Sequence, residues 1–119
     1  MPRAKTIYVD LDATLNEYGT WKGGHHFPPL RPGALGFLDN LLAQGFRLKL
    51  YTARAVNWKL QVEAWLVREG LDRYFVAVTA EKGMDAWLFV DDRGIQFQGD
   101  YAEVLAKIDA WKHVEPTGA

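Results

Sequence analysis

The sequence predicts a single α/β domain built on a doubly wound, central parallel sheet. The 119 residues are enough for one hydrophobic core but not for two. Short runs rich in β-branched and aromatic residues alternate with longer amphipathic segments. Helices that separate strands along a chain favour parallel pairing through right-handed crossovers, with helices on both faces of the sheet. We therefore expect one domain that spans residues 1–119.

Four apolar runs predict strands, of which the first is typical of a strand buried on both faces, and a fifth run predicts a short edge strand. The four main runs cover residues 6–9, 48–52, 74–78 and 87–90. The shorter run, residues 95–97, predicts a short fifth strand at one edge of the sheet.

Three apolar stripes with helical spacing lie between or after these strands, and each predicts a helix face packed against the core. Gly45 and Gly70 follow the first two stripes, and Asp100 precedes the third as a candidate cap. The stripes are formed by Leu35, Leu38, Leu41 and Leu42, by Trp58, Val62, Trp65 and Leu66, and by Val104, Leu105, Ile108 and Trp111.

Residues 15–29 depart from this pattern, because they are rich in glycine, polar and aromatic residues and predict a flap rather than a helix. Trp21, His25 and His26 lie on this flap, where they either contact a substrate or pack the flap against itself. Two adjacent histidines without a third ligand nearby do not predict a zinc site. Residues 114–119 predict a frayed tail.

Composition excludes several classes of protein. A net charge of −1 argues against binding by general attraction to nucleic acid or to anionic membranes. The absence of cysteine excludes disulfides, thiolate catalysis and cysteine-ligated zinc. No segment has the length of a membrane span or of a signal-peptide core, so we expect a cytoplasmic protein.

Polar side chains follow three of the predicted strands, where open parallel sheets bind ligands. Several carboxylates that converge there would repel one another, and a divalent cation would relieve this repulsion. Oxygen ligands without cysteine favour Mg²⁺ over Zn²⁺. These residues are Asp10 and Asp12 after the first strand, Thr52 and Arg54 after the second, and Asp91, Asp92 and Arg93 after the fourth, with Lys82 shortly before the fourth.

Each of these features has a structural explanation when it is taken alone. An Asp-x-Asp sequence often forms a turn or a helix cap, Asp91-Asp92 can form a turn between two elements, and an isolated lysine is usually solvated. Arg54 and Arg93 can simply balance nearby carboxylates. It is the combination, in this order and at these strand ends, that predicts a functional site.

The combination resembles the haloacid dehalogenase-like (HAD) phosphohydrolases. Asp10-Leu11-Asp12-Ala13-Thr14 is similar to their first motif, Asp-x-Asp-x-Thr, although Ala13 stands where many members have glycine. Tyr51-Thr52 resembles the second motif, Lys82 the third and Val90-Asp91-Asp92 the fourth. The resemblance covers residues 6–93 and implies a Rossmann-like HAD fold.

The resemblance also implies a reaction and a role for each residue. Asp10 would attack a phosphoryl group to form an aspartyl-phosphate, and Asp12 would act as the acid and then as the base. Mg²⁺ would be held by the Asp10 carboxylate, the main-chain carbonyl of Asp12 and Asp92, with Asp91 orienting Asp92. Thr52 and Lys82 would hold the phosphoryl oxygens.

The same resemblance bears on the substrate. The intervals between the motifs leave no room for a cap domain, which implies an open site, unless a second copy in a homo-oligomer covers it. Phosphorylated small molecules and nucleic-acid ends are both compatible with an open site. Thr52-Ala53-Arg54 is similar to the phosphatase domain of polynucleotide kinase-phosphatases, where the residue that matches Arg54 helps to bind phosphate. A different class, the phosphoacceptor receiver domain, stays an alternative.

Overall fold

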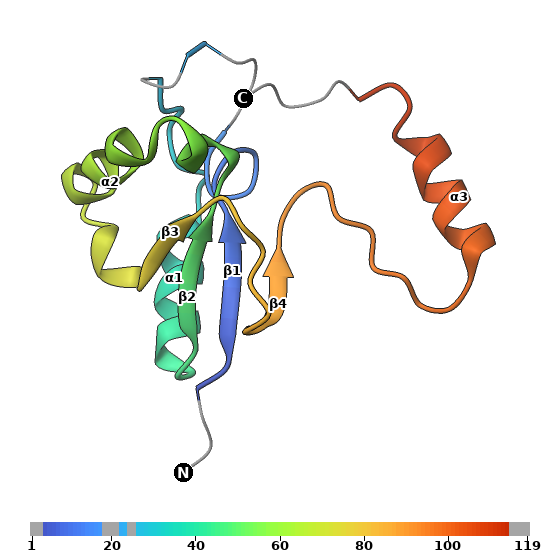
Figure 1. Cartoon of the computed structure of the whole chain (residues 1–119), viewed down its shortest axis with the longest axis horizontal. Helices are drawn as coiled ribbons and strands as arrows, with labels where there is room; N and C mark the ends of the chain where they lie inside the picture. Colours follow the sequence, from blue (N-terminus) through green and yellow to red (C-terminus); the bar gives the residue numbers. More distant parts are fainter. Residues whose placement is uncertain (1–3, 18–21, 24–25, 115–119) are drawn as a thin grey trace.

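The computed structural model describes residues 4–17, 22–23 and 26–114, and it contains a four-stranded sheet in which every pairing is parallel (Figure 1). The strand order is β3-β2-β1-β4, so the chain starts in the interior of the sheet, moves outward in one direction and then returns to the opposite edge. The strands are β1 (Thr6–Asp10), β2 (Arg47–Tyr51), β3 (Ala77–Thr79) and β4 (Ala86–Val90).

Three α-helices and two short 3₁₀ turns connect or follow these strands. α1 joins β1 to β2, α2 joins β2 to β3, and α3 follows β4. Their bounds are α1 (Ala34–Ala43), α2 (Lys59–Arg68) and α3 (Tyr101–Ala110), and the 3₁₀ turns are η1 (Ala53–Val56) and η2 (Asp72–Tyr74). The result is a parallel α/β architecture that is consistent with a Rossmann-like fold.

The buried core lies between one face of the sheet and the helices α1 and α2. Ile7 and Val9 of β1 stand beside Leu48 and Leu50 of β2, and these side chains share one face because the strands pair in register. Leu38 of α1 packs in the same cluster, as do Val62, Trp65 and Leu66 of α2. Both helices therefore cover the same face, as right-handed crossovers in one direction require.

The opposite face of the sheet carries the segment 80–85 instead of a helix (Figure 1). The Tyr8 hydroxyl donates a hydrogen bond to Asp85 Oδ1 over 2.5 Å, and Lys49 Nζ lies 2.8 Å from Asp85 Oδ2. Gly83 passes so close to the Tyr8 hydroxyl that a β-carbon at this position would collide with it. The doubly wound arrangement expected from the sequence is thus realised on one face only.

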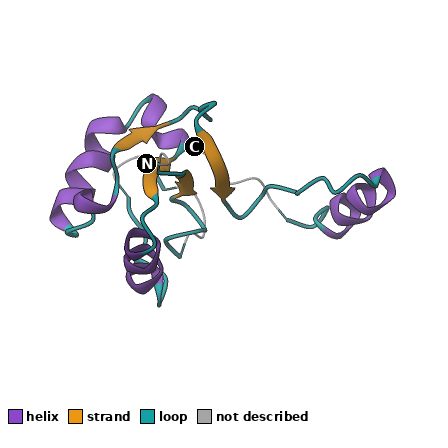
Figure 2. Ribbon diagram, turned by 90° about the horizontal axis from the view of Figure 1, so that it is seen from below, coloured by secondary structure: helices purple, strands orange, loops and turns teal. Residues whose placement is uncertain are grey.

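The helix α3 lies away from the sheet, and none of its residues is buried (Figures 1 and 2). The prediction that its apolar stripe packs against the core of its own chain was wrong. The helix itself forms as expected, and the Asp100 side chain caps it by accepting a hydrogen bond from the Ala102 N–H over 2.9 Å.

Two strand predictions also need correction. Residues 95–97 form no strand, and they lie on the connection that leads from β4 to α3. The third strand begins at Ala77 rather than at Tyr74, because Tyr74 belongs to η2 and its hydroxyl donates to Asp39 Oδ1. The apolar residues 74–76 therefore led to a predicted strand that begins three residues before the observed one.

The predicted flap is closed at its base. Asn16 and Leu30 form an antiparallel bridge, and the Glu17 N–H donates to the Pro29 carbonyl over 2.8 Å. Phe27 stacks on Trp65 of α2 with ring centroids 5.0 Å apart, which anchors the returning segment on the core. Trp21 and His25 lie outside the described residues, as do the tail residues 115–119.

No helix in the described part of the chain is both long enough and apolar enough to cross a membrane.

Candidate active site

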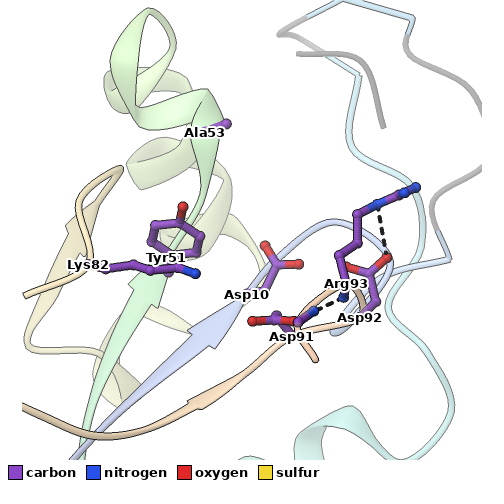
Figure 3. Close-up of a pocket in the computed structure, with 8 residues that line it drawn as sticks. Asp10, Tyr51, Ala53, Lys82, Asp91, Asp92 and Arg93 are labelled. Carbon is purple, nitrogen blue, oxygen red and sulfur yellow. Dashed lines mark hydrogen bonds and ion pairs between the residues drawn. The ribbon is translucent and has the colours of Figure 1, made fainter. Parts of the chain in front are cut away.

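A cavity of about 310 Å³ opens at the carboxyl ends of β1, β2 and β4 (Figure 3). This is the position where parallel sheets place their ligands, because the strand ends and the following loops meet there. The cavity is lined by Asp10, Tyr51, Ala53, Lys82, Asp91, Asp92, Arg93 and Gly94.

Asp10 and Asp92 form the acidic centre of the cavity. They come together because β1 and β4 are parallel neighbours and Asp92 follows β4 by two residues. Both carboxyl groups line the cavity, where Asp92 is close enough to influence the pKa of Asp10. Burial first, and then the interaction with Asp92, raises the pKa of Asp10 from 3.8 to about 7, while the Thr14 hydroxyl, 3.2 Å from Asp10 Oδ2, opposes the shift.

Asp91 shapes the turn that carries Asp92. Its Oδ1 accepts hydrogen bonds from the backbone N–H groups of Arg93, over 2.9 Å, and of Gly94. A β-carbon on Gly94 would meet this oxygen at 2.9 Å, so the Asp91 side chain would have to shift. Arg93 Nε lies 3.6 Å from Asp92 Oδ2, and Figure 3 shows both side chains at the rim of the cavity.

Asp12 lies beside the cavity and pairs with a buried arginine. Arg54, which is only 2 % exposed, places its Nε 2.8 Å from Asp12 Oδ2 and its Nη2 3.1 Å from Asp12 Oδ1. Asn16 donates a further hydrogen bond to Asp12 Oδ1 over 2.9 Å. The ring of Phe27 lies 4.8 Å from the Arg54 guanidinium, which completes an enclosed, bidentate ion pair.

The turn that presents Asp12 depends on an unusual backbone conformation. Ala13 has a φ of 66°, a left-handed value that costs free energy for a residue with a β-carbon. Its N–H donates to Asn16 Oδ1 over 2.9 Å, and its carbonyl accepts a hydrogen bond from Arg31 Nη2 over 3.0 Å. Asn16 and Arg31 thus hold this turn, and the sequence analysis did not identify either of them.

Thr52 and Lys82 occupy different environments. Thr52 is buried at the end of β2, where its Oγ1 accepts a hydrogen bond from the Arg54 N–H over 3.2 Å and so caps η1. Lys82 lies at the cavity with its Nζ 5.7 Å from the Tyr51 ring centroid and 5.2 Å from that of Phe89. Lys82 therefore brings a positive charge to the face of the cavity opposite Asp92 (Figure 3).

The site residues expected from the sequence thus divide into two groups. Asp10, Lys82, Asp91 and Asp92 line the cavity, whereas Asp12 and Thr52 both contact Arg54 beside it. Tyr51 and Ala53 were missed as lining residues, although their position directly around Thr52 at a strand end was a usable signal. Of the flap residues, His26 is exposed, and its N–H donates to the Gly23 carbonyl.

The fit of a metal ion depends on the oxygen atoms present. Within residues 4–17, 22–23 and 26–114, no three or more acidic or histidine side chains are grouped so that they could hold a metal ion. The two carboxylates of Asp10 and Asp92 are nevertheless the type of ligand that Mg²⁺ takes, since Mg²⁺ keeps several waters and is bound by one or two carboxylates together with substrate phosphate. The chemistry of the donors fits Mg²⁺ better than a metal that needs a full protein cage.

Comparison with known proteins supports the fold. No protein-family model and no curated protein matches the sequence. A solved structure, described as that of a conserved protein coded by a locus from Bacteroides thetaiotaomicron, is similar with a TM-score of 0.60 and 25% sequence identity. The similarity covers 92% of this chain and 93% of that chain. It extends over nearly the whole of both chains, and what it shares with this protein is a parallel α/β fold.

Proposed function

We propose that this chain is a magnesium-dependent phosphohydrolase of the HAD type, which cleaves a phosphate monoester through an aspartyl-phosphate on Asp10. The observation that carries the proposal is the approach of Asp10 and Asp92 at the carboxyl ends of two neighbouring strands, with Lys82 on the same cavity. The raised pKa of Asp10 supports the proposal, because perturbed carboxyl groups that line a cavity cluster at functional sites.

In this proposal Asp10, Asp92 and the main-chain carbonyl of Asp12 hold Mg²⁺. Bound there, the ion would offset the repulsion between the two carboxylates and neutralise charge on the phosphoryl oxygens. Asp91 is already engaged in the turn through its Oδ1, which supports Asp92 as the direct ligand and Asp91 as the residue that positions it.

The reaction uses Asp10 as the nucleophile. One Asp10 oxygen attacks phosphorus, the bond between phosphorus and the ester oxygen breaks, and the ester oxygen leaves with the electron pair and takes up a proton. Water then attacks the phosphorus of the aspartyl-phosphate, which restores Asp10 and releases inorganic phosphate. Lys82 stabilises the negative charge on the phosphoryl oxygens, because phosphoryl transfer depends mainly on positioning and on cations around these oxygens.

Asp12 serves as the proton donor in this proposal, and its carboxyl group is held by Arg54 and Asn16. Both of its oxygens accept hydrogen bonds from Arg54, and one also accepts from Asn16. These guanidinium and amide N–H groups only donate, and they direct the carboxylate toward Arg54 and Asn16. In this proposal one Asp12 oxygen faces the leaving oxygen of the bound substrate, while Arg54 holds the side chain in place through the other.

The substrate class follows from the open cavity and from the cations at its rim. A phosphorylated small molecule fits a cavity of about 310 Å³. A polynucleotide end is the alternative of the same chemistry. Arg54, which suggested it, does not line the cavity, whereas Arg93 does and lies 5.5 Å from the ring of Trp111. A cation beside an aromatic ring is able to contact a phosphate and a base together.

The test is turnover of p-nitrophenyl phosphate with Mg²⁺. We expect Asp10→Asn to abolish release of phosphate with the fold intact by circular dichroism, and Asp12→Asn to lower the rate about 10²–10⁴-fold. Asp72→Asn, a matched change at an exposed residue of η2, should leave the rate unchanged. Excess chelator should remove activity, and added Mg²⁺ should restore it.

Undiminished turnover by Asp10→Asn, or the full rate in excess chelator, would overturn the proposal. A panel of phosphorylated metabolites beside 3′- and 5′-phosphorylated oligonucleotides then identifies the substrate class. A preference for the oligonucleotides that is lost in Arg93→Ala would favour the alternative.

A further inference from the structure

The segment 80–85 brings Lys82 to the cavity, and Asp85 anchors the end of this segment on the sheet. Asp85 Oδ1 accepts a hydrogen bond from the Tyr8 hydroxyl over 2.5 Å, and Asp85 Oδ2 accepts one from Lys49 Nζ over 2.8 Å. The hydrogen bond from Lys49, followed by that from Tyr8, lowers the pKa of Asp85 from 3.8 to about 2, so the carboxylate stays ionised at neutral pH. Because residues 80–85 form no helix or strand, such contacts set the path of the backbone at Lys82.

Tyr8 is buried in the middle of β1, and it supports the segment in two ways. Its side chain is part of a residue only 2 % exposed, and its hydroxyl reaches Asp85. The backbone of Gly83 passes so close to this hydroxyl that only a residue without a β-carbon fits there. The Tyr8 ring also lies 5.3 Å from the ring of Phe89, its paired neighbour on β4. One side chain thus contacts both the backbone next to Lys82 and the ring of Phe89.

Two aromatic rings lie around the Lys82 ammonium at the cavity. Its Nζ is 5.2 Å from the ring centroid of Phe89 and 5.7 Å from that of Tyr51. Figure 3 shows the Lys82 side chain passing the Tyr51 ring with its nitrogen toward Asp10. Aromatic rings attract a cation placed over their faces, and lysine has a long, flexible stem. The rings and the anchored backbone together therefore limit where the charge of Lys82 lies.

We propose that Tyr8 and Asp85 are positioning residues that hold Lys82 against the phosphoryl group of the substrate. The inference rests on the proposed function, in which Lys82 stabilises the phosphoryl oxygens. Neither Tyr8 nor Asp85 lines the cavity, so both act on the reaction through Lys82. Their effect on the rate is large because a displacement of about 1 Å at a reacting group lowers the rate on the order of 10²-fold.

Tyr74 is a matched control, because it makes the same kinds of contact away from the cavity. It is also 2 % exposed, its hydroxyl donates to Asp39 Oδ1 over 2.6 Å, and the guanidinium of Arg73 lies 4.2 Å from its ring. Tyr8→Phe and Tyr74→Phe each remove one hydroxyl that donates to an aspartate and keep the ring. Both should lower stability in urea unfolding, but only Tyr8→Phe should change the site.

The first test measures kcat/KM for p-nitrophenyl phosphate with Mg²⁺. We expect Tyr8→Phe to lower it about 10-fold, which is less than the loss in Lys82→Ala, and Tyr74→Phe to leave it unchanged. Asp85→Asn, whose amide oxygen still accepts from Tyr8, should keep more activity than Asp85→Ala. In a Lys82→Ala background Tyr8→Phe should have no further effect, because its action passes through Lys82. An unchanged kcat/KM in Tyr8→Phe, an equal loss in Tyr74→Phe, or the same loss in the Lys82→Ala background would overturn the inference.

The second test follows the anchored segment without turnover, by hydrogen exchange of the backbone amides of residues 80–86. We expect these amides to exchange faster in Tyr8→Phe, because the segment opens more often, and at the wild-type rate in Tyr74→Phe. Unchanged exchange in Tyr8→Phe would overturn the inference. A wild-type chain that does not turn over the ester would instead overturn the proposed function, and hydrogen exchange would still decide whether Tyr8 holds the Lys82 segment.

Discussion

The part of the sheet formed by β1, β2 and β3 differs from the β4–α3 region in what covers its apolar residues. In the first region α1 and α2 bury Leu38 and Val62 completely, together with the strand residues beneath them. In the second region α3 carries a comparable apolar stripe, yet none of its residues is buried. An apolar stripe predicts that a surface will be buried, but it does not specify which surface buries it. This difference motivates three measurements.

The largest effect is expected where a charge is enclosed. Arg54→Leu should lower the free energy of unfolding by about 3–5 kcal/mol, because it leaves the Asp12 carboxylate mostly buried without its cation. Arg93→Leu is the matched change in the β4 region, and it should cost at most about 1 kcal/mol, since its partner Asp92 lies 3.6 Å away at a partly exposed site. Urea unfolding measures both, and equal losses would contradict the comparison.

A matched pair of leucines measures the contrast in burial. Leu38→Ala should lower the free energy of unfolding by about 2–5 kcal/mol, because Leu38 is 0 % exposed and its loss leaves a cavity. Leu105→Ala should change it by no more than about 0.5 kcal/mol, because Leu105 is 63 % exposed on α3. Thermal or urea unfolding gives both values. A large loss for Leu105→Ala would mean that the α3 stripe is covered in solution.

A third measurement concerns pH in the absence of divalent cations. The pKa of Asp10 is raised to about 7 in the folded protein and is near 3.8 in the unfolded chain, so the folded state binds the additional proton between these values. Stability should therefore fall as pH rises from about 4 to about 7, by at most about 1.4 kcal/mol per pH unit for one proton. Asp10→Asn should remove this slope in urea unfolding with chelator present, and an identical slope in both proteins would contradict the shift.

Much of the fold could be predicted from local sequence. The strands β1, β2 and β4 lie within one residue of their predicted bounds, because short continuous apolar runs between polar ends are typical of strands. The helices follow from apolar spacing, and the cap at Asp100 follows from residue type. Residues 95–97 carry the same apolar character as a strand, but a strand also needs a hydrogen-bonding neighbour, and no sequence signal places one beside them.

The candidate site could be predicted only in part. The convergence of Asp10 with Asp92 follows from the parallel order of β1 and β4, and the sequence indicated it through polar residues at strand ends. The contact between Arg54 and Asp12 could not be derived in the same way. Arginine has a long side chain that can reach either a cavity or a neighbouring carboxylate. Here the Arg54 guanidinium lies against the Phe27 ring and binds Asp12. The roles proposed for Asp12, Thr52 and Lys82 stay predictions until activity is measured.

The sequence by itself determined the alternation of strands and helices, the caps and turns, and the acidic residues at the strand ends, because each of these depends on neighbours within a few residues. Tertiary structure alone decided which face of the sheet each helix covers, which acid pairs with Arg54 and where α3 lies. These outcomes depend on competition between distant surfaces for the same contacts, and that competition leaves no periodic signal in the order of the amino acids.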